Sequence, residues 1–143
     1  MGEQKLMYVG GEGGTGKSRV IHGVKMLVEL MGQRSMLQLA GTTGAAADNI
    51  DSSTIHSCAG LNFDEKEKRP EIVGEQKMLK KIWRNKQILI IDEASMLSLK
   101  MLHNINYKCK KLRDNEASFE GIQVIMLFGN FFQMPPVNGY ALY

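Results

Sequence analysis

A glycine-rich segment at residues 10–18, GGEGGTGKS, carries the clearest chemistry in the sequence. Gly11, Gly16, Lys17 and Ser18 fit the spacing G-x-x-x-x-G-K-[ST] of a phosphate-binding loop. Glycines let backbone N–H groups approach phosphate oxygens, the lysine ammonium reaches the β- and γ-phosphates, and the serine hydroxyl ligates Mg²⁺. The pattern predicts a nucleoside triphosphate site. The residues expected to contact the nucleotide are Gly11, Gly13, Gly14, Thr15, Gly16, Lys17, Ser18 and Arg19.

An acidic pair, Asp92 and Glu93, follows the apolar run at 88–91 in ILIIDEAS. Open α/β sheets bind their ligands at the carboxyl ends of their strands, so this position suits a site. Asp92 can hold Mg²⁺ through a water, and Glu93 can orient the attacking water or accept its proton. Taken alone, the pair fits a solvated turn equally well. Together with the phosphate loop, the pair favours hydrolysis of the triphosphate over transfer of its phosphoryl group to a small acceptor.

Gln133 lies in the segment FGNFFQMPPV, residues 128–137, directly after another apolar run. Its amide has both a donor and an acceptor, so it could sense the γ-phosphate or the attacking water. Two interpretations stand for Phe131 and Phe132. Packing in a core or an interface is one, and stacking on a nucleic-acid base is the other.

The segment TTGAAADNIDSSTIHSCAGL, residues 42–61, is rich in small and hydroxyl side chains at the expected start of a helix. Such residues suit contacts with the phosphates of a nucleic-acid backbone. His56 has no Cys or Asp at metal-ligand spacing, which argues against zinc.

Apolar runs alternate with helical patterns along the chain, which predicts an α/β fold with a parallel sheet flanked by helices. The first expected helix places Val20, Val24, Leu27 and Val28 on one face. The polar segment 62–77 is expected to be a surface loop. The expected strands cover residues 5–9, 35–40, 87–92 and 122–129, and the expected helices cover 18–30, 43–50, 75–86 and 98–112.

Length and composition fit one domain of an ordinary globular protein, with 143 residues, 43% hydrophobic and 23% charged. The net charge of +3 permits an anionic partner without requiring one. Cys58 and Cys109 are interpreted as reduced thiols of an intracellular protein. No apolar run approaches the ~20 residues that would span a membrane, and no signal peptide is expected.

The four segments GGEGGTGKSRVI, TTGAAADNIDSSTIHSCAGL, LIIDEASML and FGNFFQMPPV occur in the order seen in the PIF-type 5′-to-3′ DNA helicases of superfamily one, and the chain resembles this family over nearly its whole length. The helicase portion of Helitron transposons is similar. The resemblance implies that residues 1–143 form the first of two RecA-like domains. ATP would bind between the two domains, and single-stranded DNA would cross their tops. The resemblance also implies roles in DNA repair, recombination and telomere maintenance. The expected location is the nucleus, with the mitochondrion as the alternative.

Carried over position by position, the resemblance assigns a role to each candidate. Ser18 and Asp92 would hold Mg²⁺, and Lys17, Glu93 and Gln133 would be the catalytic residues. Glu93 would activate water, and Gln133 would couple the γ-phosphate to movement. The residues expected near the DNA strand are Thr43, Thr54, His56 and Ser57.

Three departures from the family pattern limit the expected activity. Asn130 stands where the family usually has Asp, and MGEQK is too short for the glutamine motif that reads the adenine. The resemblance also implies a second RecA-like domain, which this sequence lacks. That domain should bring an arginine that stabilises the transition state. Such arginines contribute ~10³–10⁵ in rate. The chain alone is therefore expected to bind Mg²⁺–ATP, hydrolyse it very slowly and not unwind DNA.

Two alternatives of different class remain open at this point. A P-loop nucleotide or small-molecule kinase would transfer the γ-phosphate to a nucleoside or sugar, with no effect of DNA. A truncated, non-enzymatic remnant would bind nucleotide or nothing. The sequence does not determine the oligomeric state.

Overall fold

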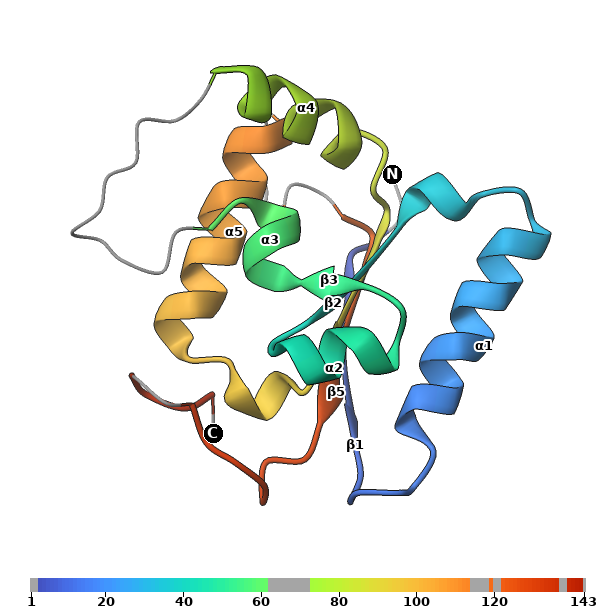
Figure 1. Ribbon diagram of the computed structural model, residues 1–143, viewed down its shortest axis with the longest axis vertical. Coiled ribbons are helices and arrows are strands. Elements are labelled where there is room, and N and C mark those ends of the chain that lie inside the picture. The colour runs from blue at the N-terminus through green and yellow to red at the C-terminus, as the bar shows by residue number, and fades with distance from the viewer. Residues whose placement is uncertain (1–2, 62–72, 114–118, 120–121, 137–138, 143) are drawn as a thin grey trace.

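The structure, a computed structural model, describes residues 3–61, 73–113, 119, 122–136 and 139–142. Five parallel strands form one sheet in the order β1-β5-β4-β2-β3 (Figure 1). The predicted α/β class and parallel sheet are therefore confirmed. The strands are β1 (Lys5–Gly10), β2 (Leu37–Gly41), β3 (Ser53–Thr54), β4 (Ile88–Asp92) and β5 (Val124–Gly129).

Helices cover both faces of the sheet, with α1 on one side and α3, α4 and α5 on the other (Figure 1). No helix within the described ranges is long and apolar enough to cross a lipid bilayer. The helices are α1 (Lys17–Leu30), α2 (Gly44–Asn49), α3 (Ile55–Ala59), α4 (Val73–Trp83) and α5 (Leu99–Arg113), and the 3₁₀ turns are η1 (Arg34–Met36) and η2 (Ala94–Met96).

The central strand β4 is apolar on both faces because it separates two cores. Leu89 and Ile91 join a cluster with Ile105 of α5, whereas Ile90 joins a second cluster with Ile21 of α1. All five side chains are fully buried. Alternation along a strand sends neighbouring residues to opposite faces, so a continuous apolar run is what a doubly covered strand requires.

The strand register brings the carboxyl ends of the strands to one edge of the sheet. Gly10 of β1 pairs with Gly129 of β5, and Gly41 of β2 pairs with Asp92 of β4. A Cβ on Gly41 would collide with the backbone of Ala47, so the absence of a side chain there lets α2 fold back over the sheet. The loops that follow four strands therefore meet at this edge.

The first strand lies at the margin of the sheet and is largely exposed. Within the described ranges β1 pairs only with β5, and Leu6 is 64% exposed. The predicted apolar face of α1 was wrong in part, because Val20 and Leu27 are 48% and 58% exposed. The predicted Val24 and Val28 do pack against the sheet, together with Ile21, which was not predicted.

Several predicted boundaries shift for local reasons. The second strand begins at Leu37 because residues 34–36 form a 3₁₀ turn. Thr43 lies before α2 as its N-cap, with its hydroxyl oxygen accepting the Ala46 N–H at 3.2 Å. The predicted loop 62–77 and the predicted helix 75–86 overlap, and α4 begins earlier than either bound, at Val73. Residues 62–72 lie outside the described part.

Trp83 ties α4 to α3, and its replacement tests the packing of this layer. The ring is fully buried, and Nε1 donates to the Cys58 carbonyl at 2.8 Å. We expect Trp83→Phe to lower the free energy of unfolding by roughly 1–3 kcal/mol, since a cavity and an unpaired carbonyl remain. Urea unfolding followed by circular dichroism measures this. The exposed neighbour Ile82→Ala should cost less, and equal losses in the two variants would contradict the assignment.

Candidate nucleotide-binding site

The glycine-rich segment forms the turn between β1 and α1, where the sequence predicted a phosphate loop. Gly14 and Gly16 have φ values of +79° and +93°, in the left-handed region that favours glycine. Gly16 is also the N-cap of α1 and has no side chain to satisfy the first amides of the helix. Those N–H groups and the positive end of the helix dipole suit an anion such as a phosphate.

The Lys17 ammonium lies inside this loop. Its Nζ donates to the carbonyl of Gly11 at 2.6 Å and to that of Glu12 at 2.8 Å. The Thr15 hydroxyl donates to the same Glu12 carbonyl at 2.8 Å. These bonds hold a full positive charge against the backbone that is expected to surround the phosphates. Ser18 is half-buried and Arg19 is exposed on the first turn of α1.

Asp92 ends β4 with its carboxylate buried, at 4% exposure. Burial raises the pKa of Asp92, whereas the Glu93 N–H, which donates to Oδ1 at 2.9 Å, and the charge of Lys17 lower it. The Lys17 ammonium of the phosphate loop thus lies within electrostatic reach of this carboxylate. The donors available to a metal are then a carboxylate and the Ser18 hydroxyl. Both are hard oxygen ligands of the kind that Mg²⁺ prefers, so the residues fit this ion.

Glu93 is held in a left-handed conformation, with φ of +55°. Non-glycine residues in this region are uncommon and occur often at functional sites. The Thr42 hydroxyl donates to the Glu93 carbonyl at 3.0 Å and helps to hold the turn. Burial and the negative charge of Asp92 raise the pKa of Glu93, and the charge of Lys17 lowers it. A raised pKa suits a general base. The sequence reasoning did not single out Thr42, whose hydroxyl holds this turn.

Gln133 lies beside the phosphate loop, on the turn after β5. A Cβ built on Gly13 would come within 3.4 Å of the Gln133 Nε2 atom. The turn is held by Asn130, whose backbone carbonyl accepts the Gln133 N–H and whose Oδ1 accepts the Phe132 N–H, both at 3.0 Å. The amide oxygen of Asn130 supplies the acceptor that an aspartate would supply, without its charge.

The two phenylalanines of this turn have different surroundings. Phe131 stacks on Tyr8 of β1, with ring centroids 4.5 Å apart and planes at 13°. The packing interpretation therefore holds for Phe131. Phe132 is 98% exposed, and its stacking on a base stays a prediction.

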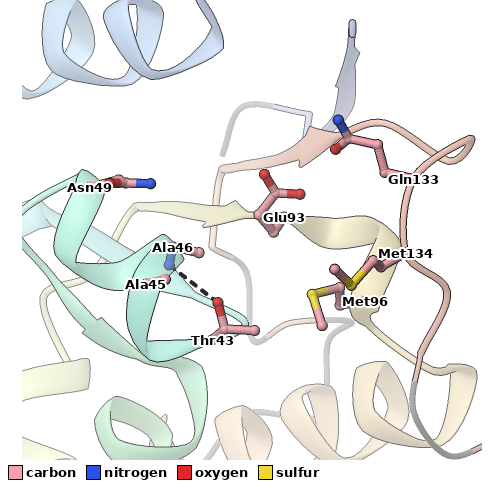
Figure 2. Close-up of a pocket in the computed structure, with 8 residues that line it drawn as sticks. All are labelled: Thr43, Ala45, Ala46, Asn49, Glu93, Met96, Gln133 and Met134. Atoms are coloured by element: carbon pink, nitrogen blue, oxygen red, sulfur yellow. Dashed lines mark hydrogen bonds between the residues drawn. The ribbon is translucent and has the colours of Figure 1, made fainter. Parts of the chain in front are cut away.

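A cavity of about 660 Å³ opens at the carboxyl ends of β2, β4 and β5. It brings together three predicted residues, Thr43, Glu93 and Gln133, from three separate segments (Figure 2). Sequence reasoning did not single out Asn49, Met96 or Met134, although each lies within one of the four motif segments. We call this the strand-end cavity, and its lining residues are Thr43, Ala45, Ala46, Asn49, Glu93, Met96, Gln133 and Met134.

Thr54, His56 and Ser57, predicted beside the DNA strand, are not among the residues that line the strand-end cavity. Thr54 is the N-cap of α3, where its Oγ1 accepts the Ser57 N–H at 3.3 Å and donates to the Ser57 Oγ at 3.2 Å. His56 is buried, and burial lowers the pKa of its imidazole. Their contact with DNA stays a prediction.

Comparison with known proteins places these features in a family. A family model described as PIF1-like helicase matches residues 1–141. The ATP-dependent DNA helicase RRM3 of Saccharomyces cerevisiae is 35% identical over 134 residues, which make up 92% of this chain and 18% of that protein.

Solved structures agree with the sequence match. The Pif1 helicase from Candida albicans aligns with a TM-score of 0.75 and 36% identity, over 94% of this chain and 31% of that chain. The Pif1 helicase from Bacteroides in complex with ADP-AlF3 and ssDNA aligns with a TM-score of 0.75 and 32% identity, over 95% of this chain and 30% of that chain. The chain thus spans less than a third of each of these proteins, and its sheet is the RecA-like α/β fold that they share.

The raised pKa of Asp92 predicts that the site weakens the fold. A carboxyl whose pKa is raised by folding stabilises the protein below its unfolded pKa, ordinarily 3.8, and this contribution is lost as pH rises through the folded pKa. Without Mg²⁺ or nucleotide, Asp92→Asn should therefore raise the free energy of unfolding near neutral pH by roughly 0.5–2 kcal/mol. The gain should shrink as the pH falls toward 3.8.

Urea unfolding at several pH values measures the Asp92→Asn effect. The matched control is Asp48→Asn on the exposed side of α2, which should leave the midpoint nearly unchanged. A loss of stability in Asp92→Asn at neutral pH would contradict the electrostatic account.

Proposed function

The chain belongs to the PIF1-like helicase family, and from this membership we propose that it is the ATP-binding, first RecA-like domain of an ATP-dependent 5′-to-3′ DNA helicase. One observation carries the proposal. The phosphate loop, Asp92, Glu93 and Gln133 come from three loops and meet at one edge of the sheet, with Lys17 electrostatically coupled to both carboxylates. This is the set of groups that triphosphate hydrolysis requires.

Each group has a role that follows from its surroundings. The amides of residues 13–18 and the Lys17 ammonium bind the triphosphate, and Ser18 and Asp92 would hold Mg²⁺. The metal ion, when bound, neutralises charge on the phosphates. Glu93, with its raised pKa, orients the attacking water and takes its proton. Gln133 lies against the loop at Gly13, where it can respond to the γ-phosphate.

Single-stranded DNA is the proposed polymer substrate, supported by the Bacteroides Pif1 helicase, which was solved with ssDNA. The contacts proposed for the DNA backbone are Thr43, Thr54, His56 and Ser57. A second RecA-like domain is the proposed partner for translocation and unwinding. The kinase alternative has no support from the family match. The corresponding biological role is in DNA repair, recombination and telomere maintenance. The proposed location is intracellular, in the nucleus or the mitochondrion.

Lys17→Ala tests the nucleotide site. Hydrogen bonds to a charged group contribute about 1.5–3 kcal/mol, so we expect the affinity for Mg²⁺–ATP to fall roughly tenfold or more. Titration with a fluorescent ATP analogue measures the dissociation constant. The matched control is Lys81→Ala, on the exposed side of α4 away from the loop (Figure 1). Equal affinities of wild type and Lys17→Ala, in folded proteins, would overturn the nucleotide site.

The isolated 143-residue chain should not unwind DNA, because it spans only about 30% of the solved Pif1 helicase from Bacteroides. A strand-displacement assay with a duplex that carries a 5′ single-stranded tail tests this. We expect no product above the level without ATP. Displacement that needs ATP and disappears in Lys17→Ala would show that one RecA-like domain suffices, contrary to the proposal.

A further inference from the structure

The strand-end cavity opens beside Glu93 and Gln133. The loop follows β1 at the margin of the sheet, whereas the cavity opens over β5, β4 and β2, which are the next three strands in order. No residue of the segment 11–18 lines it. Gln133 borders both, since its amide reaches Gly13 on one side and the cavity on the other. The cavity can therefore hold a ligand other than the triphosphate.

The charge of the lining disfavours a phosphate as that ligand. Glu93 is the one ionisable side chain among the lining residues, and its charge is negative when ionised. Among the described residues no Lys, Arg or His lines the cavity, so an anion there would meet a carboxylate and no cation of the lining itself. An uncharged ligand is favoured, because it avoids this repulsion.

The remaining lining groups suit a flat, polar ring. Asn49 and Gln133 present amides at opposite ends of the cavity, with Glu93 between them (Figure 2). An amide both donates and accepts, so it can pair with the edge of any base. Met96 and Met134 lie together on one wall, and thioethers make favourable contacts with aromatic rings (Figure 2). A volume of about 660 Å³ accommodates a purine or a pyrimidine.

We propose that the strand-end cavity receives one unstacked nucleobase of single-stranded DNA, with Asn49 hydrogen-bonded to the base edge and Met96 and Met134 against the ring. The phosphates stay outside, away from Glu93. This inference rests on the proposed function and deepens it, because it names the part of the DNA that enters the site. The base then touches Glu93 and Gln133, which are also the residues proposed to act on the triphosphate, so that DNA and ATP contact the same two residues.

The test compares two fluorescein-labelled oligonucleotides, oligo(dT) and an abasic oligomer with the same number of phosphates, by fluorescence anisotropy with the 143-residue chain. Stacking contributes about 1–3 kcal/mol per base, so wild type should bind oligo(dT) at least about fivefold more tightly. Asn49→Ala and, separately, Met134→Ala should lose most of this preference and leave the abasic affinity unchanged. Asn85→Ala, an exposed asparagine at the other end of β4, is the matched control and should behave as wild type.

Each outcome decides the inference. If wild type binds the two oligomers equally, the proposal that a base enters the cavity is wrong. The proposed DNA binding would then depend on phosphate contacts alone. A preference for oligo(dT) that survives in both Asn49→Ala and Met134→Ala places the base elsewhere and also overturns it. Failure of both oligomers to bind overturns the cavity together with the proposed DNA contact, whereas the ATP titration above decides the nucleotide site independently. Circular dichroism melting confirms that the variants are folded.

Discussion

The parallel register of the sheet is the constraint on which the site depends. Because Gly10 pairs with Gly129 and Gly41 with Asp92, four strands end at the same edge. The loops that follow them carry the phosphate loop, α2, the acidic pair and the Gln133 turn. A slip of one residue in any strand would turn its apolar side chains to the wrong face and move its loop along the edge. The two cores on either side of β4 therefore fix the chemistry as well as the fold.

Three charged side chains at this edge, Lys17, Asp92 and Glu93, affect one another electrostatically. Burial disfavours the charges of Asp92 and Glu93, and Lys17 partly offsets this for both. The same lysine is hydrogen-bonded to the loop carbonyls of Gly11 and Glu12. The one ammonium therefore links the loop backbone to the two carboxylates. The residues proposed for catalysis are thus the ones whose charges burial disfavours, a combination that is common where function and stability compete.

Much of this arrangement could be predicted because it depends on local patterns. The glycine spacing and the acidic pair at the end of an apolar run indicate a phosphate loop and a carboxylate on one sheet edge once the strands are taken as parallel. Asn49 and Met134 could not be predicted, since their shared cavity depends on how α2 and the Gln133 turn pack together. The Thr54 hydroxyl suits both a helix cap and a phosphate contact, and only its bonds to Ser57 show the cap.

The strand that carries the phosphate loop is also the most exposed strand of the sheet. β1 offers Leu6 and Tyr8 to solvent, and within the described ranges the backbone on its outer side has no strand partner. An open edge with apolar side chains is a template for pairing with another polypeptide. Within the described sheet, this edge is therefore the place where a further strand can pair. The open edge and the anchoring of the phosphate loop thus belong to the same six residues, Lys5–Gly10.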